Sequence, residues 1–156
     1  MKYSFSVLFI CVTPTSSYIV FSTGREIRKI DENFINKNPQ PNSTVIKNDL
    51  EEAVSLDFDY DDRIIFWSDI GYERINGMYL NDSRIFSVIS SEIIAPVGLA
   101  CDWITKKIYW ADSDTNRIEV ANYNGSSRKV LFWENMDQPR AIVLVPADGL
   151  VCLFFR

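Results

Sequence analysis

Two acidic segments hold the residues of this 156-residue chain that are best suited to chemistry. Residues 57–62 (DFDYDD) and 112–117 (DSDTNR) both begin with the Asp-x-Asp-x-[Asp/Asn] spacing of a calcium-binding EF-hand loop. Such a loop also needs glycine at its sixth position and a bidentate glutamate at its twelfth. Both segments lack these two residues, so we expect neither a metal site nor any other cofactor.

The same carboxylates have a spacing that acid–base catalysis can use. Asp57 and Asp59 are two residues apart, as are Asp112 and Asp114, and side chains two apart point to one side of a strand. Paired carboxylates catalyse glycoside hydrolysis. However, the chain contains no histidine, the commonest general base, and no nucleophile motif accompanies the pairs. We therefore expect no catalytic residues and no enzymatic activity.

The overall composition argues against several classes of partner. The net charge of −5 opposes binding to nucleic acid, whose phosphates require a basic surface, and binding to anionic membranes. The three cysteines, Cys11, Cys101 and Cys152, are far apart and odd in number, which gives neither a zinc motif nor a disulfide framework. With 47% hydrophobic residues, the chain has enough apolar side chains to fill the core of one domain.

The N-terminus has the features of a secretory signal. Lys2 precedes an apolar run at residues 5–12 (FSVLFICV), and small residues follow at 13–17 (TPTSS). This run, like every later apolar run, is shorter than the roughly 20 residues that span a bilayer. We expect residues 1–17 to be a signal peptide that directs the chain into the secretory pathway. The alternative is that this segment forms a first buried strand.

A repeat with a period of 43 residues organises the rest of the sequence. The segment IIFWSD (64–69) aligns with KIYWAD (107–112), and SLDFDY (55–60) aligns with GLACDW (98–103). The same offset reaches AIVLVP (141–146). A period in the low forties is typical of β-propeller blades and of helical solenoids. Alternating β-branched and aromatic residues, separated by turn signals, favour four short antiparallel strands per repeat, which is one propeller blade.

The second strand of each repeat carries the most distinctive residues. For the repeat at 92–133 we expect strands near 98–103, 107–111, 117–122 and 127–132. Large aromatics in the second strand can pack between blades, and the aspartate that ends it can bind backbone donors of the following turn. We expect such structural roles for the motif residues Phe66, Trp67, Ser68, Asp69, Tyr109, Trp110, Ala111 and Asp112.

The motifs FWSD and YWAD resemble the YWTD repeat of the low-density-lipoprotein-receptor family (class B) of β-propellers. The stretches GLACDW, KKIYWADSDTNRIEVANYNGSSRKVLFW and DQPRAIVL resemble the first propeller of the Wnt co-receptors in that family. The resemblance implies an all-β, six-bladed propeller on the extracellular side of a single-pass membrane receptor. It also implies extracellular protein partners, namely Wnt ligands and secreted antagonists such as Dickkopf and sclerostin.

The resemblance extends over residues 18–151. Six blades of this period need roughly 260 residues, so we expect a truncated, partial YWTD β-propeller with roughly three of the six four-stranded blades. Where a third motif is due, the sequence reads CLFF, and we interpret residues 152–156 as a tail foreign to the family. Made on its own, a partial array exposes unpaired strand edges, and we expect it to be marginally stable or prone to aggregation.

The resemblance further implies a ligand-binding rim at one end of the propeller, where the family grips an Asn-x-Ile peptide. Each implied position lies just before a first strand or after a second strand, so the positions share one rim. Its acidic residues favour a basic ligand, Arg140 can hydrogen-bond a peptide oxygen, and Val97 stands where the family usually has aspartate. The implied residues are Glu51, Glu52, Ile70, Gly71, Glu73, Ile94, Ala95, Val97, Asp114 and Arg140.

Three other functions remain open at this point. A lipoprotein-receptor-type propeller would help to release ligand at low pH, although such switching usually depends on histidine. A secreted decoy would bind ligand without passing on a signal. A calcium-dependent propeller hydrolase would belong to another class of protein, and the two failed calcium loops oppose it.

Three sites have the Asn-x-Ser/Thr sequence of N-linked glycosylation. They begin at Asn42, Asn81 and Asn124, and each lies in a predicted turn or linker. In a secreted protein such positions are accessible to the glycosylation machinery. We therefore expect a glycoprotein.

Overall fold

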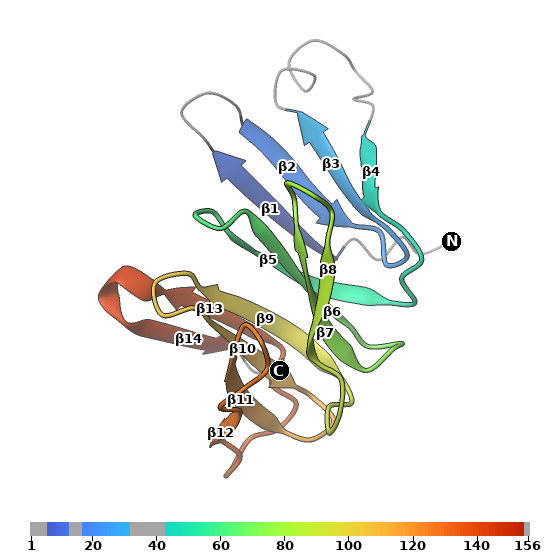
Figure 1. Cartoon of the computed structure of the whole chain (residues 1–156). Coiled ribbons are helices and arrows are strands. Elements are labelled where there is room, and N and C mark those ends of the chain that lie inside the picture. The colour runs from blue at the N-terminus through green and yellow to red at the C-terminus, as the bar shows by residue number, and fades with distance from the viewer. Residues whose placement is uncertain (1–5, 13–16, 32–42, 155–156) are drawn as a thin grey trace.

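The computed structural model describes residues 6–12, 17–31 and 43–154, which form strands and turns with one short 3-10 helix. Three antiparallel sheets of four strands and one sheet of two strands follow one another along the chain (Figure 1). We refer to them as blade 1 (β1–β4), blade 2 (β5–β8), blade 3 (β9–β12) and the blade 4 hairpin (β13–β14). No helix in this part of the chain has the length and apolar character that a membrane crossing needs.

Within each blade, every strand pairs with its neighbours in sequence. Blade 1 consists of β1 (Ser6–Val12), β2 (Ser17–Ser22), β3 (Ile27–Asp31) and β4 (Thr44–Lys47). Blade 2 consists of β5 (Ala53–Asp59), β6 (Ile64–Asp69), β7 (Arg74–Tyr79) and β8 (Ile85–Ile89). Blade 3 consists of β9 (Pro96–Asp102), β10 (Lys107–Asp112), β11 (Arg117–Asn122) and β12 (Lys129–Phe132). The hairpin consists of β13 (Ala141–Val145) and β14 (Leu150–Phe154), with the 3-10 turn η1 (Pro146–Asp148) between them.

The first strands of successive blades lie side by side. β1 contacts β5, β5 contacts β9, and β9 contacts β13, so the sheets follow one another from the blue to the red end of the chain (Figure 1). A radial succession of four-stranded antiparallel sheets is the arrangement of a propeller. The expected all-β, partial propeller is therefore confirmed. In blade 3 the predicted strands are found, except that the fourth begins later, at Lys129, because a turn occupies the residues before it.

Two predicted segment boundaries fall near the ends of the described residues. β1 lies inside the segment expected to be a signal peptide, and it pairs with β2, with Val12 opposite Ser17. A first strand in this segment is the alternative to a signal peptide that the sequence left open. β14 covers most of the segment expected to be a foreign tail, with Cys152 opposite Val143 of β13. The boundaries themselves remain predictions.

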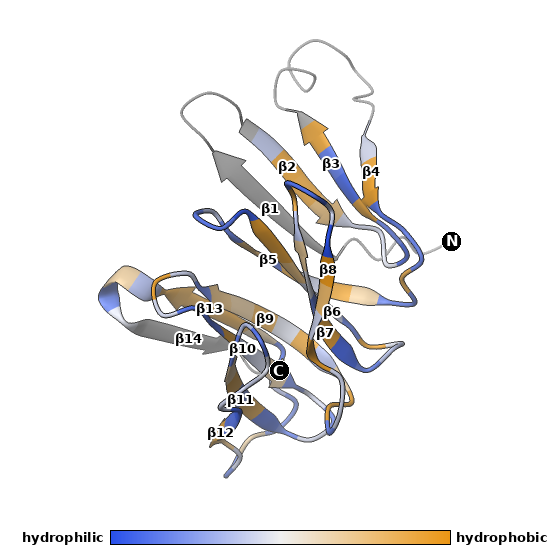
Figure 2. Ribbon diagram, viewed as in Figure 1, coloured by the Kyte–Doolittle hydropathy of each residue, from blue (hydrophilic) through white to orange (hydrophobic). Residues whose placement is uncertain are grey.

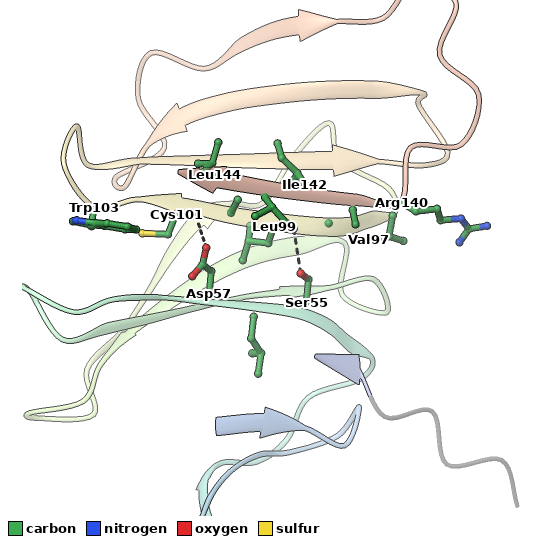
Figure 3. A pocket seen from close by; sticks show the side chains of 14 residues that line it. Ser55, Asp57, Val97, Leu99, Cys101, Trp103, Arg140, Ile142 and Leu144 are labelled. Atoms are coloured by element: carbon green, nitrogen blue, oxygen red, sulfur yellow. Dashed lines mark hydrogen bonds between the residues drawn. The ribbon is translucent and has the colours of Figure 1, made fainter. Parts of the chain in front are cut away.

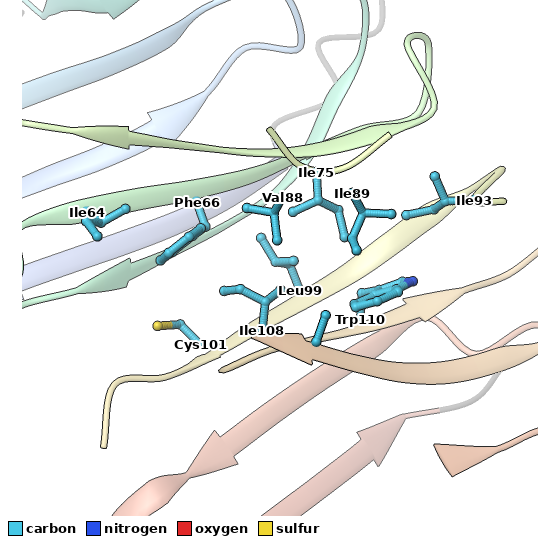
Figure 4. Close-up of a cluster of buried hydrophobic side chains, with 11 residues drawn as sticks. Ile64, Phe66, Ile75, Val88, Ile89, Ile93, Leu99, Cys101, Ile108 and Trp110 are labelled. Carbon is cyan, nitrogen blue, oxygen red and sulfur yellow. The ribbon is translucent and has the colours of Figure 1, made fainter. Parts of the chain in front are cut away.

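Apolar side chains fill the spaces between neighbouring blades. Hydrophobic residues lie along the strands, while many of the turns are hydrophilic (Figure 2). The cluster between blades 2 and 3 includes Ile64, Phe66, Leu99 and Trp110 (Figure 4). Trp67 occupies the corresponding place between blades 1 and 2. Both tryptophans are at most 1% exposed, so each buries on the order of 150–250 Å² of surface.

Candidate ligand-binding rim

The residues implied to bind ligand lie at one end of the blades, which we call the rim. The rim consists of the segments before the first strands and the turns after the second strands. In blade 2, Glu51 and Glu52 precede β5, while Ile70, Gly71 and Glu73 follow β6. The two segments touch, because the N–H of Ile70 donates to the carbonyl oxygen of Glu52 at 3.0 Å.

The rim of blade 3 has the same construction. Ile94 and Ala95 precede β9, and Asp114 lies in the turn that follows β10. Here the N–H of Ser113 donates to the carbonyl oxygen of Ala95 at 3.0 Å. The structure therefore brings the implied residues of each blade together in pairs of adjacent segments.

A buried aspartate at the end of β6 holds the two rim segments of blade 2 together. The carboxylate of Asp69, which has no exposed surface, accepts hydrogen bonds from the N–H groups of Glu51 and Glu52, each at 3.0 Å. It also accepts the N–H groups of Gly71 and Tyr72 in the following turn, at 3.0 and 3.1 Å. A Cβ atom on Gly71 would lie 2.3 Å from Cγ of Glu51, which explains why glycine occupies this position.

The aspartate at the end of β10 makes the same four bonds in blade 3. The carboxylate of Asp112 accepts the N–H groups of Ile94 and Ala95 at 2.8 and 3.2 Å. It also accepts those of Asp114 and Thr115 at 3.1 and 3.0 Å. We call each arrangement a carboxylate clasp. The sequence predicted the bonds to the following turn but missed the two donors before the first strand, since these are 17 and 18 residues earlier in the chain.

The clasps fix the backbone of the rim and leave many of its side chains in solvent. Glu51, Glu52, Glu73 and Asp114 are all exposed, so the surface carries four carboxylates. Ile94 is 45% exposed and adds an apolar contact area among them. This combination can hold a ligand that is basic and partly apolar.

Four further polar or charged residues, which were not among the predicted site residues, also lie on the rim: Arg25, Asn116, Asp137 and Gln138. Arg25, in the turn after β2, has its guanidinium 3.9 Å from the carboxylate of Glu51, and both groups are exposed, so this ion pair contributes little to stability. Asp137 is exposed at the position 43 residues after Ile94. The N–H of the next residue, Gln138, donates to Oδ1 of Asn116 at 2.9 Å. Aligning the turns and the third repeat would have identified these residues.

A cavity of about 430 Å³ runs along the first strands of blade 2, blade 3 and the blade 4 hairpin (Figure 3). Val97 and Arg140 lie at its rim end and Trp103 at its other end, with Leu99 between them. A Cβ atom on Gly98 would lie 3.0 Å from the carbonyl oxygen of Arg140, so glycine allows β13 to approach β9. The last two implied rim residues therefore lie where the rim meets this cavity. Arg140 directly precedes β13 as expected, whereas Val97 lies inside β9, so the expectation that it precedes the strand is wrong.

Two side chains of β5 satisfy backbone donors on the edge of β9 that faces away from β10. Oγ of Ser55 accepts the N–H of Leu99 at 3.1 Å, and the carboxylate of Asp57 accepts the N–H of Cys101 at 2.6 Å. Burial raises the pKa of Asp57 to about 7, although its hydrogen bonds to backbone N–H groups act in the opposite direction. This role was not predictable from local sequence, because each contact joins residues 44 apart.

The raised pKa of Asp57 makes the stability of the fold depend on pH. Between the ordinary value of 3.8 and about 7, the folded chain binds a proton that the unfolded chain does not, so acidification within this window stabilises the fold. We expect a higher thermal midpoint at about pH 5.5 than at about pH 8, and we expect Asp57→Asn to remove most of this difference. Asp61→Asn, in an exposed turn, is the control. An unchanged pH dependence in Asp57→Asn would contradict the assignment.

The second carboxylate of the same strand joins blades 2 and 3 at the end opposite the rim. Asp59 is fully buried. Its carboxylate accepts hydrogen bonds from Nζ of Lys106 and Oη of Tyr123, both at 2.8 Å, and from the N–H of Asp62 at 3.0 Å. Burial alone would raise the pKa of Asp59, but these bonds and the charge of Lys106 hold it below its usual range. Sγ of Cys101 lies 2.7 Å from the hydroxyl of Tyr123, and burial raises the pKa of this thiol.

The two pairs of aspartates noted in the sequence differ in where the structure places them. Asp57 and Asp59 both face blade 3, as their spacing predicted, but each is bonded to donors of that blade. Asp112 ends β10 and Asp114 lies in the turn after it, so the expectation that this pair shares one side of a strand is wrong. Within the described ranges, no three histidine, cysteine, aspartate or glutamate side chains are grouped to hold a metal ion.

Comparison with known proteins identifies the repeat. Residues 106–144 match the model of the low-density lipoprotein receptor repeat class B. Over 136 residues, or 86% of the chain, the sequence is 44% identical to low-density lipoprotein receptor-related protein 5 of Mus musculus and 43% identical to that of Homo sapiens. The chain spans 8% of the length of each of these relatives.

Solved structures show the same fold. A chain in the crystal structure of a nidogen/laminin complex superposes with a TM-score of 0.80 at 25% identity, covering 88% of this chain and 52% of that one. An auxiliary nutrient binding protein from Bacteroides thetaiotaomicron superposes with a TM-score of 0.71 at 10% identity, covering 96% of this chain and 36% of that one, which is a likeness of fold alone. The receptor and YWTD-propeller relatives are not enzymes, which agrees with the expectation of a non-catalytic chain.

Proposed function

The chain carries the class B repeat of the low-density lipoprotein receptor and folds as a YWTD propeller segment, and on this premise we propose that its rim binds extracellular protein ligands. The observation that carries the proposal is the pair of carboxylate clasps, which hold the rim segments of two blades in one repeated geometry. A surface that is ordered before binding loses little conformational entropy when a ligand docks. With Asp137 the rim has five exposed carboxylates, which outnumber its exposed arginines Arg25 and Arg140 and so attract a basic ligand.

Wnt ligands and secreted antagonists of the Dickkopf or sclerostin type are the partners that we propose. The identity of 44% to a receptor-related protein supports a segment of a membrane receptor that faces the extracellular space. The same proposal includes passage through the secretory pathway, with residues 1–17 as signal peptide, 18–151 as propeller segment and 152–156 as a tail outside the family. Cleavage of this signal peptide would remove β1 from blade 1.

Calorimetric titration of the chain with a lysine-flanked synthetic peptide containing Asn-x-Ile tests the proposed rim. We expect saturable binding that weakens at least about tenfold in the double variant Glu51→Lys/Glu73→Lys, because reversing two rim charges repels a basic ligand. Asp61→Lys/Asp148→Lys makes a matched charge change in two exposed turns at the end of the blades opposite the rim. Absence of binding to the unaltered chain, or equal affinities of the rim and control variants, would overturn the proposal.

We also propose that the exposed turn asparagines carry N-linked glycans. Asn81 lies in the turn between β7 and β8 and Asn124 in the turn between β11 and β12, and both are exposed. Oδ1 of Asn124 accepts the N–H and the hydroxyl of Ser126 at 3.0 and 2.7 Å, so the acceptor sequence forms a local turn. Asn42 lies outside the described residues.

Glycan attachment is expected to appear as a loss of mass when the secreted chain is treated with a peptide-N-glycosidase. Ser83→Ala and Ser126→Ala are each expected to remove one glycan, because each deletes the hydroxyl that the acceptor sequence requires. Ser127→Ala changes a neighbouring serine outside these sequences and is expected to leave the glycans in place. An unglycosylated secreted chain would refute the assignment.

A further inference from the structure

An arginine outside the rim reaches the loop that leads into it. Arg128 lies just before β12, whereas the loop between β8 and β9 carries Ser91 and Glu92 and continues to the rim residue Ile94. Nη1 of Arg128 donates to the carbonyl oxygen of Ser91, and Nη2 donates to that of Glu92, both at 2.7 Å. The guanidinium therefore spans the loop just upstream of the clasped residues.

The other edge of this guanidinium is anchored inside blade 3. Nε and Nη2 of Arg128 donate to the two carboxylate oxygens of Glu119 at 2.7 and 3.0 Å, and Glu119 on β11 is only 2% exposed. The guanidinium also lies 5.3 Å from the ring of the buried Trp110. Because the planar guanidinium is bonded on both edges, it holds the loop at a fixed distance from β11.

The corresponding loop of blade 2 is held differently. There the N–H groups of Leu50 and Ala53 donate to the carbonyl oxygens of Arg25 and Gly24 at 3.2 and 2.8 Å. In blade 3, Pro96 takes the place of Ala53, and proline has no N–H to donate.

The arginine–glutamate pair is also specific to blade 3. Ile85 and Asn76 stand in blade 2 at the positions of Arg128 and Glu119, 43 residues earlier. The contacts of Arg128 and Glu119 therefore occur in blade 3, the blade in which proline replaces a residue whose N–H could donate to the neighbouring blade.

We propose that Arg128 is a positioning residue of the rim, which holds the loop at residues 91–95 so that Ile94 is presented to ligand. This role rests on the proposed function of the rim. It predicts that loss of the guanidinium frees the N–H groups of Ile94 and Ala95 from the carboxylate of Asp112, while the clasp of blade 2 stays closed. The blade 2 clasp is thus a control within the same molecule.

Amide hydrogen exchange measured by NMR on the full chain tests this role. In Arg128→Lys, which keeps the charge beside Glu119 but loses the planar fork, we expect the amides of Ile94 and Ala95 to exchange at least about tenfold faster. The amides of Glu51 and Glu52 are expected to be unchanged. Arg84→Lys, which makes the same exchange at an exposed position before β8, is the matched control. Arg128→Met/Glu119→Gln provides a second variant that leaves no buried charge unpaired.

Titration of the same variants with the Asn-x-Ile peptide separates the two proposals. Faster exchange confined to Ile94 and Ala95, together with peptide affinity about fivefold to tenfold weaker, supports the positioning role. Equal acceleration in both clasps, or local acceleration without weaker binding, overturns it. If the unaltered chain does not bind the peptide, the proposed function fails, and the exchange data alone then decide whether Arg128 holds the loop.

Discussion

Replacement of Asp112 by alanine is expected to lower the free energy of unfolding by about 4 kcal/mol, the largest effect of any single change in the rim. The carboxylate is fully buried and accepts four backbone N–H groups, so its removal leaves several donors unpaired. Hydrogen bonds to charged groups contribute about 1.5–3 kcal/mol each, and part of this loss is recovered as water reaches the turn. Urea denaturation followed by circular dichroism gives the measurement, with sucrose present in all samples so that the variants of this marginally stable chain start folded.

Two further variants separate the clasp from general effects of charge. Asp112→Asn keeps the size of the side chain but places an amide donor against one of the N–H groups, and we expect it to lose roughly half as much stability. Asp114→Asn removes a nearby exposed carboxylate and is expected to change the free energy of unfolding by less than about 0.5 kcal/mol. Equal stabilities of the Asp112→Asn chain and the unaltered chain would refute the clasp.

Replacement of Lys106 by methionine is expected to lower the free energy of unfolding by about 3 kcal/mol. Its ammonium group pairs with the fully buried Asp59 at 2.8 Å and with the partly exposed Asp62 at 2.7 Å. Methionine keeps the length of the side chain, but it leaves the carboxylate of Asp59 buried without its cation. Chemical denaturation at neutral pH measures the loss.

A second change in the same network identifies its cause. Adding Asp59→Asn to Lys106→Met removes the unpaired charge, so we expect the double variant to be more stable than Lys106→Met alone. Lys107→Met removes the neighbouring lysine, whose ammonium group makes one long bond of 3.4 Å to a turn carbonyl, and it is expected to have little effect. Additive losses in the double variant would show that the two side chains do not act as a pair.

The 43-residue period made the blades and the order of their strands predictable, because propeller blades repeat in sequence as they do in space. Bonds within one turn were also predictable, as with the bonds from Asp112 to the turn that follows it. The packing of the second-strand aromatics between blades was expected, but the polar contacts between blades were not predictable, because they depend on how two sheets are rotated against each other. Asp57 shows this, since its bond to Cys101 appears only when β5 and β9 lie side by side.

Contacts made by residues that depart from the repeat were also not predictable from the sequence. Arg128 and Glu119 have no counterparts in the preceding repeat, where Ile85 and Asn76 stand. Comparison of the repeats could show that these residues differ, but it could not show that they meet the loop before β9. That contact follows from the three-dimensional course of the loop after Ile89.

Each carboxylate clasp binds only backbone N–H groups, and this has a consequence for how such rims diversify. Every residue except proline supplies such a donor, so substitutions at Glu51 or Ile94 that avoid proline alter charge and shape while the same frame persists. A change of rim side chains in one blade is therefore expected to leave the clasp of the neighbouring blade closed. The frame itself requires only the carboxylates of Asp69 and Asp112, since Asp114 donates in blade 3 the N–H bond that Gly71 donates in blade 2.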